Sequence, residues 1–183
     1  MKSEGWKNEG GLRKKGYFQQ SYTGKPLISI ITVVLNSERY LEETILSVIN
    51  QPYDNIEYII IDGGSSDGTL DIIKKYENKI NYWVSEKDSG IYEAMNKGIA
   101  LVTGDWVNFV NSSDTINKNA YGVISDYLVD CSHQCNVVAF GYSFTKINSK
   151  GILSKVERKP SLNKKWKMPS SHNTIIYKSN VLR

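Results

Sequence analysis

Residues 27–62 read LISIITVVLNSERYLEETILSVINQPYDNIEYIIID, with two long apolar runs on either side of an amphipathic segment. The runs over 27–35 and 56–62 are nearly continuous and rich in β-branched residues, which is typical of strands buried on both faces. Between them, Ser37 can cap a helix over 38–50, which Pro52 ends. A strand, a helix and a second strand in this order predict a β-α-β unit of a parallel sheet.

The rest of the chain continues the alternation of strand-like and helix-like segments. We expect further helices over 69–77, 91–101 and about 118–130, and further strands over 80–85, 105–110 and 174–177. Residues 137–144 and 152–156 are predicted to form an antiparallel pair around the turn at 148–151. These elements predict an α/β fold with a doubly wound, mostly parallel sheet, helices on both faces and a small antiparallel C-terminal part.

The composition of the 183 residues is that of an ordinary globular domain, with 40% hydrophobic and 23% charged residues. This excludes wholesale disorder, and two cysteines exclude a disulfide scaffold and favour a reducing compartment. Glycines at positions 5, 10, 11, 16 and 24 predict an irregular arm over 1–25, ordered only where it lies on the body. We expect a single domain over 26–183.

No segment predicts secretion or membrane insertion. The run over 27–35 is far shorter than a membrane-spanning helix, and residues 1–20 contain no apolar core of a signal peptide. We therefore expect a cytoplasmic protein. Residues 146–183 contain ten Lys or Arg and one acid, Glu157. This basic tail suits an anionic partner or is a solvated surface.

The basic tail also contains the cluster Lys164-Lys165-Trp166-Lys167. Lysines near an anionic bilayer attract it, and an interleaved tryptophan prefers the interfacial zone. The cluster predicts a weak, reversible contact with the inner face of a membrane, whereas the alternative is a solvated surface. We expect no nucleic acid as a partner.

Polar residues follow each of the four strands predicted to be parallel. They are Asn36 to Glu38, Asp62 to Ser65, Glu86 to Gly90 and Asn111 to Asp114. In an open parallel sheet, ligands bind outside the carboxyl ends of the strands, where the strand order reverses. Turn chemistry explains each loop taken singly, but four such loops at one edge favour a binding site.

Several common motifs are absent or misplaced. No Gly-x-Gly-x-x-Gly follows the first strand and there is no phosphate loop ending in Gly-Lys-Ser/Thr, so the ordinary nucleotide motifs are excluded. Tyr142 and Lys146 have the spacing of short-chain dehydrogenases but lie in a strand-like stretch. Cys131, His133 and Cys135 supply three ligands where structural zinc needs four.

Acidic groups can meet a phosphate through a divalent cation. Mg²⁺ and Mn²⁺ take oxygen ligands and bridge carboxylates to substrate phosphates. Asp114 is the main candidate ligand, whereas Asp62 and Asp88 suit hydrogen bonds to a base or a ribose.

Three ordered runs carry a resemblance to a known family: PLISIITVVLNSERYLEETILSVINQ, IEYIIIDGGSSDGT and SEKDSGIYEAMNKGIALVTGDWVNFVNSSD. They resemble the family 2 glycosyltransferases, which have the Rossmann-like nucleotide-binding GT-A fold. The resemblance implies an inverting, hexosyltransferase-type enzyme that moves a sugar from a nucleoside diphosphate sugar to a glycan or lipid-linked acceptor. A nucleotide-sugar-binding module without turnover is the alternative, and a nucleotidyltransferase is disfavoured by the loop after the first strand.

The resemblance also implies roles for individual residues. It places the donor's base near 33–36 and 62–64, and its ribose and diphosphate near the segment from Asp88 to Asn96. The expected donor-binding residues are Asn36, Glu38, Asp62, Gly63, Asp88, Asn96, Asn111 and Ser113, and the expected metal ligands are Asp114 and His172.

The chain departs from the family pattern at three places. Asp62 is followed by Gly63 where the family often has a second aspartate. Asn111 and Ser113 replace two acids of the Asp-x-Asp region. Beyond Asp130 the chain has a single acid, Glu157, set among basic residues that keep it weakly basic. We therefore expect the general base, and the complete acceptor part, to lie beyond this chain, which would be inactive alone.

Overall fold

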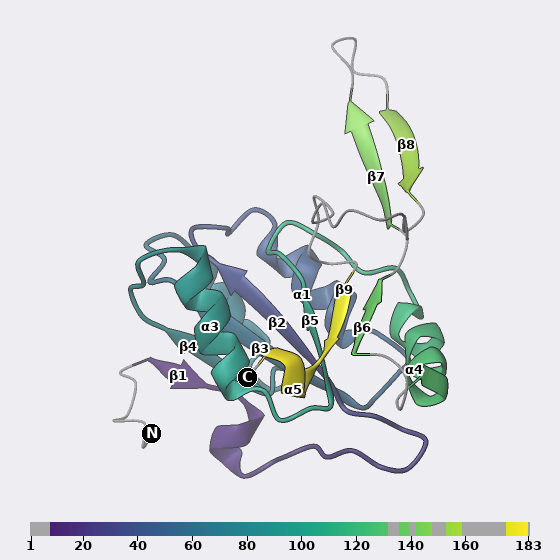
Figure 1. Cartoon of the computed structure of the whole chain (residues 1–183). Helices are drawn as coiled ribbons and strands as arrows, with labels where there is room; N and C mark the ends of the chain where they lie inside the picture. The colour runs from purple at the N-terminus through teal and green to yellow at the C-terminus, as the bar shows by residue number, and fades with distance from the viewer. Residues whose placement is uncertain (1–7, 132–135, 140–141, 148–152, 159–174, 183) are drawn as a thin grey trace.

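The computed structural model describes residues 8–131, 136–139, 142–147, 153–158 and 175–182. Seven strands form one sheet in the order β1-β4-β3-β2-β5-β9-β6 (Figure 1). These strands are β1 (Glu9–Gly10), β2 (Ile28–Val34), β3 (Ile56–Asp62), β4 (Tyr82–Ser85), β5 (Trp106–Phe109), β6 (Val137–Ala139) and β9 (Ile175–Lys178). The central four, β4, β3, β2 and β5, are parallel to one another, and β1, β9 and β6 run antiparallel to their neighbours.

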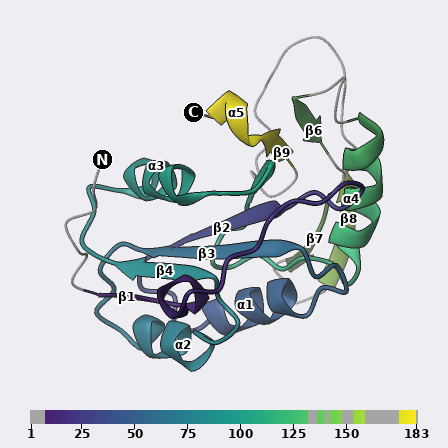
Figure 2. The same cartoon turned by 90° about the horizontal axis from the view of Figure 1, so that it is seen from below.

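Helices cover both faces of the sheet, as Figure 2 shows. The helices are α1 (Leu41–Ile49), α2 (Thr69–Lys75), α3 (Ile91–Leu101), α4 (Ala120–Cys131) and α5 (Ser179–Leu182). α1, α2 and α4 pack on the face that contains Ile28 and Ile30 of β2, whereas α3 packs on the face that contains Ile31 and Val33. Because β2 alternates between two apolar clusters, it is buried over its whole length, and the predicted doubly wound α/β fold is confirmed.

An antiparallel hairpin does form around the predicted turn at 148–151. The prediction of one continuous strand over 137–144 is wrong. Residues 137–144 divide between β6, which pairs with β9 in the large sheet, and β7 (Tyr142–Ile147). β7 pairs with β8 (Leu153–Arg158) as a separate two-stranded sheet. The division arises because β6 completes an edge of the large sheet, a partner that periodicity along the chain does not reveal.

The N-terminal arm contains regular structure where it lies on the body. β1 extends the sheet along the edge of β4, and the 3₁₀ helix η1 (Leu12–Lys15) follows it. The Leu12 and Arg13 amides donate to the carbonyls of Ile80 (3.0 Å) and Asn81 (2.9 Å). The arm therefore satisfies backbone groups that an edge strand otherwise exposes.

No helix within the described ranges is both long and apolar enough to cross a membrane.

Close packing of α3 on the sheet leads to a first testable prediction. A Cβ atom at Gly98 would lie 2.6 Å from Cγ2 of Ile31, a fully buried residue of β2. Gly98→Ala improves helix propensity by about 1 kcal/mol, but forcing a methyl group into a packed interior costs about 1–3 kcal/mol. The difference is a net loss of up to about 2 kcal/mol in unfolding free energy, measured by urea denaturation. An increase in stability would contradict this close approach.

Candidate functional site

The strand order reverses between β2 and β5. From β2 the chain continues outward through β3 and β4, and then returns to place β5 on the other side of β2. In an open parallel sheet this reversal opens a crevice at the carboxyl ends of the two strands. The polar loops after β2, β3, β4 and β5 all leave the sheet at this edge, as the sequence predicted (Figure 1).

The loops after β2 and β3 are interlocked by reciprocal hydrogen bonds. Asn36, which has a left-handed backbone (φ 49°), donates its amide to Ser65 Oγ (2.8 Å) and accepts the Ser66 amide on its side chain (2.9 Å). Glu38 accepts the amide of Gly68 (2.8 Å) at the start of α2. Glu38 thus caps α2 with a carboxylate, and Asn36 sets the shape of the β2–α1 loop.

Asp62 lies at the end of β3 and is 1% exposed. Its carboxylate accepts the Ser65 amide (3.1 Å), the Ser65 hydroxyl and the Ser85 hydroxyl (2.6 Å). Asp62 therefore joins the turn after β3 to the end of β4. Its expected contact with a donor base or ribose stays a prediction.

Asp88 leans over the glycine that follows Asp62. Its Oδ1 accepts the amide of Gly90 (3.0 Å), and its Oδ2 would lie 2.8 Å from a Cβ atom at Gly63. Gly63 therefore provides the space that the Asp88 carboxylate needs.

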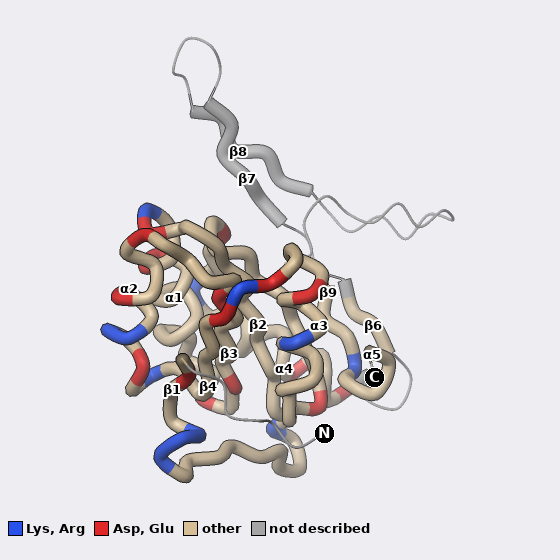
Figure 3. Tube along the Cα trace, turned by 90° about the vertical axis from the view of Figure 1, so that its left-hand side faces the viewer, with Lys and Arg blue, Asp and Glu red and all other residues tan. Residues whose placement is uncertain are grey.

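The first turn of α3 holds the β4–α3 loop. Glu93 accepts both the amide (2.8 Å) and the hydroxyl of Ser89, and Lys97 pairs with Glu93 (3.1 Å) and Glu86 (2.5 Å). Acidic and basic residues adjoin along this loop (Figure 3). The hydrogen bonds from Ser89, followed by that from Lys97, lower the pKa of Glu93 to about 2.

The lowered pKa of Glu93 predicts how the loop responds to acid. An unfolded glutamate titrates near pH 4.3. The hydrogen bonds from Ser89 to the Glu93 carboxylate therefore stabilise the folded loop fully above that pH, and this stabilisation is lost as the pH falls through about 2. We expect the exchange protection of the Ser89 amide to fall between about pH 5 and pH 2. In Glu93→Gln the protection should be lower at pH 5 and nearly independent of pH, and a wild-type profile in that variant would contradict the assignment.

The loop after β5 is tied by hydrogen bonds to the loop after β2 and to α1. Asn111 Nδ2 donates to Asp114 Oδ2 (3.0 Å), and Thr44 of α1 donates its hydroxyl to the Asp114 carbonyl (2.8 Å). The Ser37 hydroxyl donates to the Ser112 carbonyl (3.4 Å). The strand reversal therefore has Asp114 and Asn111 at its edge, in a loop that Ser37 and Thr44 hold from the side of β2.

The groups at this point fit a hard divalent cation shared with a phosphate. Asp114 and Asn111 offer a carboxylate and an amide oxygen, which suit Mg²⁺ or Mn²⁺. Among the residues with described positions, no three of His, Cys, Asp and Glu gather into a protein-only metal site. The set therefore fits an ion whose remaining ligands come from substrate phosphates and water.

Two further predicted residues are exposed: Asn96 on α3, and Ser113 next to Asp114 in the β5–α4 loop. His172, Trp166, Lys164, Lys165, Lys167, His133 and Cys135 lie outside the described residues. Tyr142 and Lys146, which have the spacing of short-chain dehydrogenases, both lie in the strand β7, as predicted, and not on a helix.

Two residues with structural roles at the site were not singled out from the sequence. Ser85 holds Asp62, and Thr44 holds the loop of Asp114. A serine that ends an otherwise apolar strand was a usable signal for Ser85. Thr44 is one of several polar residues of an amphipathic helix, so the sequence does not distinguish it as a residue of the site.

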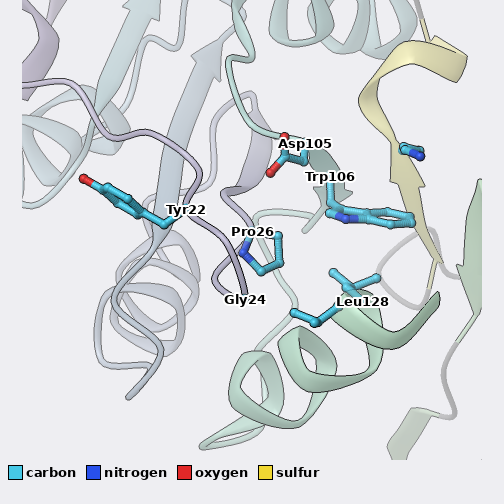
Figure 4. A pocket seen from close by; sticks show the side chains of 8 residues that line it. Tyr22, Gly24, Pro26, Asp105, Trp106 and Leu128 are labelled. Carbon is cyan, nitrogen blue, oxygen red and sulfur yellow. The ribbon is translucent and has the colours of Figure 1, made fainter. Parts of the chain in front are cut away.

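A cavity of about 270 Å³ lies at the opposite ends of the parallel strands, their amino ends (Figure 4). Tyr22 and Gly24 of the arm line it together with Pro26, Asp105, Trp106, Leu128, Val129 and Lys178. Pro26 and Asp105 precede β2 and β5, so this cavity is at the amino ends of the parallel strands and apart from the candidate site.

Comparison with known proteins gives a consistent result. The family model described as glycosyl transferase family 2 matches residues 29–181. An uncharacterized glycosyltransferase of Mycobacterium tuberculosis is 43% identical over 93 residues, which are 50% of this chain and 36% of that protein. The putative teichuronic acid biosynthesis glycosyltransferase TuaG of Bacillus subtilis is 35% identical over 122 residues, 65% of this chain and 48% of TuaG.

A solved structure with the same fold is S. aureus TarS in complex with UDP-GlcNAc. It is 25% identical, with a TM-score of 0.64, over 85% of this chain and 46% of that chain. This chain thus spans less than half the length of TarS, TuaG and the mycobacterial protein.

Proposed function

The chain belongs to glycosyltransferase family 2, and from this we propose that it transfers a sugar from a nucleoside diphosphate sugar to an acceptor hydroxyl, with inversion at the anomeric carbon. The observation that carries the proposal is the joining of the loop after β5, which contains Asn111 and Asp114, to Ser37 and to Thr44 of α1 at the strand reversal. The point where the strand order reverses is where open parallel sheets bind ligands, and its carboxylate and amide oxygens suit a metal-bound diphosphate.

We assign the diphosphate to the loop after β5. Asp114 and Asn111 would hold a Mg²⁺ or Mn²⁺ ion, which when bound would neutralise charge on the leaving diphosphate. The exposed Ser113 and Asn96 would line the path of the diphosphate, and Asn36 would shape the loop beside the ribose. Glu38 contributes indirectly, because its carboxylate caps α2.

The acceptor class follows by analogy with relatives. TuaG is named for teichuronic acid biosynthesis, and TarS was solved with UDP-GlcNAc. We propose a hexose as the transferred sugar and a glycan or lipid-linked acceptor, reached from the cytoplasmic side of a membrane. The basic residues around Trp166 would supply a weak contact with that membrane.

Donor turnover tests the proposal. Nucleoside diphosphate sugars with different bases and hexoses would be incubated with the chain and Mn²⁺, with EDTA as the control, and release of the nucleoside diphosphate measured. Mn²⁺-dependent release supports transferase chemistry. With an added acceptor, the anomeric configuration of the transferred sugar then shows whether inversion occurs. Binding without release would instead support the nucleotide-sugar-binding module, and release of pyrophosphate from nucleoside triphosphates would support a nucleotidyltransferase.

A further inference from the structure

The cavity at the amino ends of the parallel strands has no part in the chemistry proposed above. Its walls come from the end of the arm and the residue that follows it, the start of β5, the C-terminal half of α4, and β9. β2 has seven residues, so this end of the sheet lies roughly 23 Å from the end to which we assign the diphosphate. A ligand in the cavity would therefore be distinct from the donor.

Trp106 brings an unused hydrogen-bond donor to the cavity. The residue is 2% exposed, and no described residue accepts a hydrogen bond from its Nε1–H. In Figure 4 the nitrogen edge of the indole faces the space beside Pro26. Buried indole N–H groups usually have a partner, and a buried polar group without one calls for an explanation. This N–H is therefore suited to a ligand that offers an acceptor.

Asp105 brings an acceptor to the same space. Its Oδ2 accepts the Ser21 hydroxyl and the Leu27 amide (3.2 Å), whereas no group in the described ranges donates to its Oδ1. A carboxylate only accepts hydrogen bonds, and an indole N–H only donates. A ligand that satisfies both must therefore carry a donor and an acceptor close together.

The other walls define the rest of the ligand. Pro26, Leu128 and Val129 are apolar, and the lining contains one acid, Asp105, and one base, Lys178. The formal charges of the lining cancel, which favours a neutral ligand with an apolar group. The volume of about 270 Å³ is near the lower end of small-molecule pockets, about 300–1000 Å³, and suits a single ring with its substituents.

We propose that this cavity binds an N-acetylhexosamine unit of a glycan. An acetamido group has a carbonyl to accept from Trp106 Nε1–H, an N–H to donate to Asp105 Oδ1, and a methyl group to pack against Pro26 and Leu128. The inference rests on the proposed function, since it presumes a glycan acceptor. A glycan held here would be bound several units behind the end that receives the sugar, which raises the effective concentration of that end at the site of transfer.

Sugar binding is tested by protein-observed NMR titration with two probes, methyl N-acetylglucosaminide and methyl glucoside. Saturating UDP and Mn²⁺ keep the donor site occupied. The wild type should bind the acetamido sugar at least about fivefold more tightly, because methyl glucoside lacks the amide and its methyl group.

Two substitutions remove the two hydrogen bonds separately. Trp106→Phe keeps an aromatic ring without the N–H. In Asp105→Asn the amide oxygen still accepts from Leu27, and the NH₂ group replaces the open acceptor with a donor. Each should weaken binding of methyl N-acetylglucosaminide by about fivefold or more. Asp105 is exposed, so its variant tests the inference even if Trp106→Phe fails to fold.

Trp83→Phe is a matched control on the same sheet. Trp83 of β4 is 3% exposed, and its Nε1 also has no partner among the described residues. A Cβ atom at Gly10 would lie 2.6 Å from this nitrogen, so β1 closes it off from any ligand. The variant should bind the sugar like the wild type, and circular dichroism verifies the fold of each variant.

The outcomes separate this inference from the proposed function. Equal binding of the two glycosides, wild-type affinity in both cavity variants, or displacement of the sugar by UDP would each show that the cavity is not the site. Donor turnover by a wild type that binds neither glycoside also overturns the inference but leaves the proposed function standing. Binding that needs Trp106 and Asp105, without any donor turnover, supports the site and overturns the proposed function alone.

Discussion

Asp114→Asn is expected to abolish Mn²⁺-dependent binding of a nucleoside diphosphate while the fold stays intact. The substitution removes a charge with little change in shape, and Asn111 would still contact the side chain at position 114. Outer-shell partners of metal ligands are worth about 10–100-fold in affinity, so loss of the main ligand should cost at least about 100-fold. Calorimetry with UDP or GDP, with and without Mn²⁺, measures the effect.

A matched control uses an aspartate remote from the site. Asp126 is exposed on α4, and Asp126→Asn makes the same chemical change there. It should leave metal-dependent affinity at the wild-type value. If Asp114→Asn also binds like the wild type, the metal assignment is wrong, whatever its effect on stability.

The second large effect is expected at the base of the N-terminal arm. Arg13 pairs with Glu57 of β3, whose side chain is 2% exposed, and donates to the Leu101 carbonyl (2.8 Å). Glu57 also accepts the Ser29 hydroxyl (2.6 Å) and the Thr103 amide (2.9 Å). Removing one partner of a buried ion pair leaves an uncompensated charge and costs about 3–5 kcal/mol. Arg13→Ala should lower the free energy of unfolding by that amount in urea denaturation.

Two further variants define the origin of this loss. Lys14→Ala removes a neighbouring lysine that is 52% exposed and paired with Glu9, and exposed pairs contribute about 1 kcal/mol or less. Arg13→Met combined with Glu57→Met removes both charges, and part of the stability should return, since Ser29 and Thr103 still lose their acceptor. A loss in Arg13→Ala no larger than in Lys14→Ala would contradict the role given to the buried pair.

Much of the fold and of the site could be predicted from local patterns. The apolar run at 27–35 became β2 and the run at 56–62 became β3, because continuous β-branched residues favour a strand whose two faces are both covered. Parallel strands end at one edge, so the loops of Asn36, Asp62, Asp88 and Asp114 could be expected to gather there. The family resemblance then indicated the donor class.

Local patterns failed where a residue's partner is distant in the chain. Residues 137–144 read as one strand, yet β9, almost forty positions later, takes the first three of them. The arm was predicted to be ordered only where it lies on the body, but local patterns did not reveal that the edge of β4 is the partner that orders β1. In each case the deciding hydrogen bonds come from another element.

The sequence by itself determined the α/β alternation, the chemistry available at the strand ends and the likeness to a sugar transferase, because these depend on residues near one another along the chain. The tertiary structure decided which groups act together. It places β2 between β3 and β5, brings Arg13 to Glu57 across 44 positions and sets Asp88 against Gly63. The physical reason is that hydrogen bonding, charge pairing and close packing depend on separation in space, which strand order fixes and chain order does not.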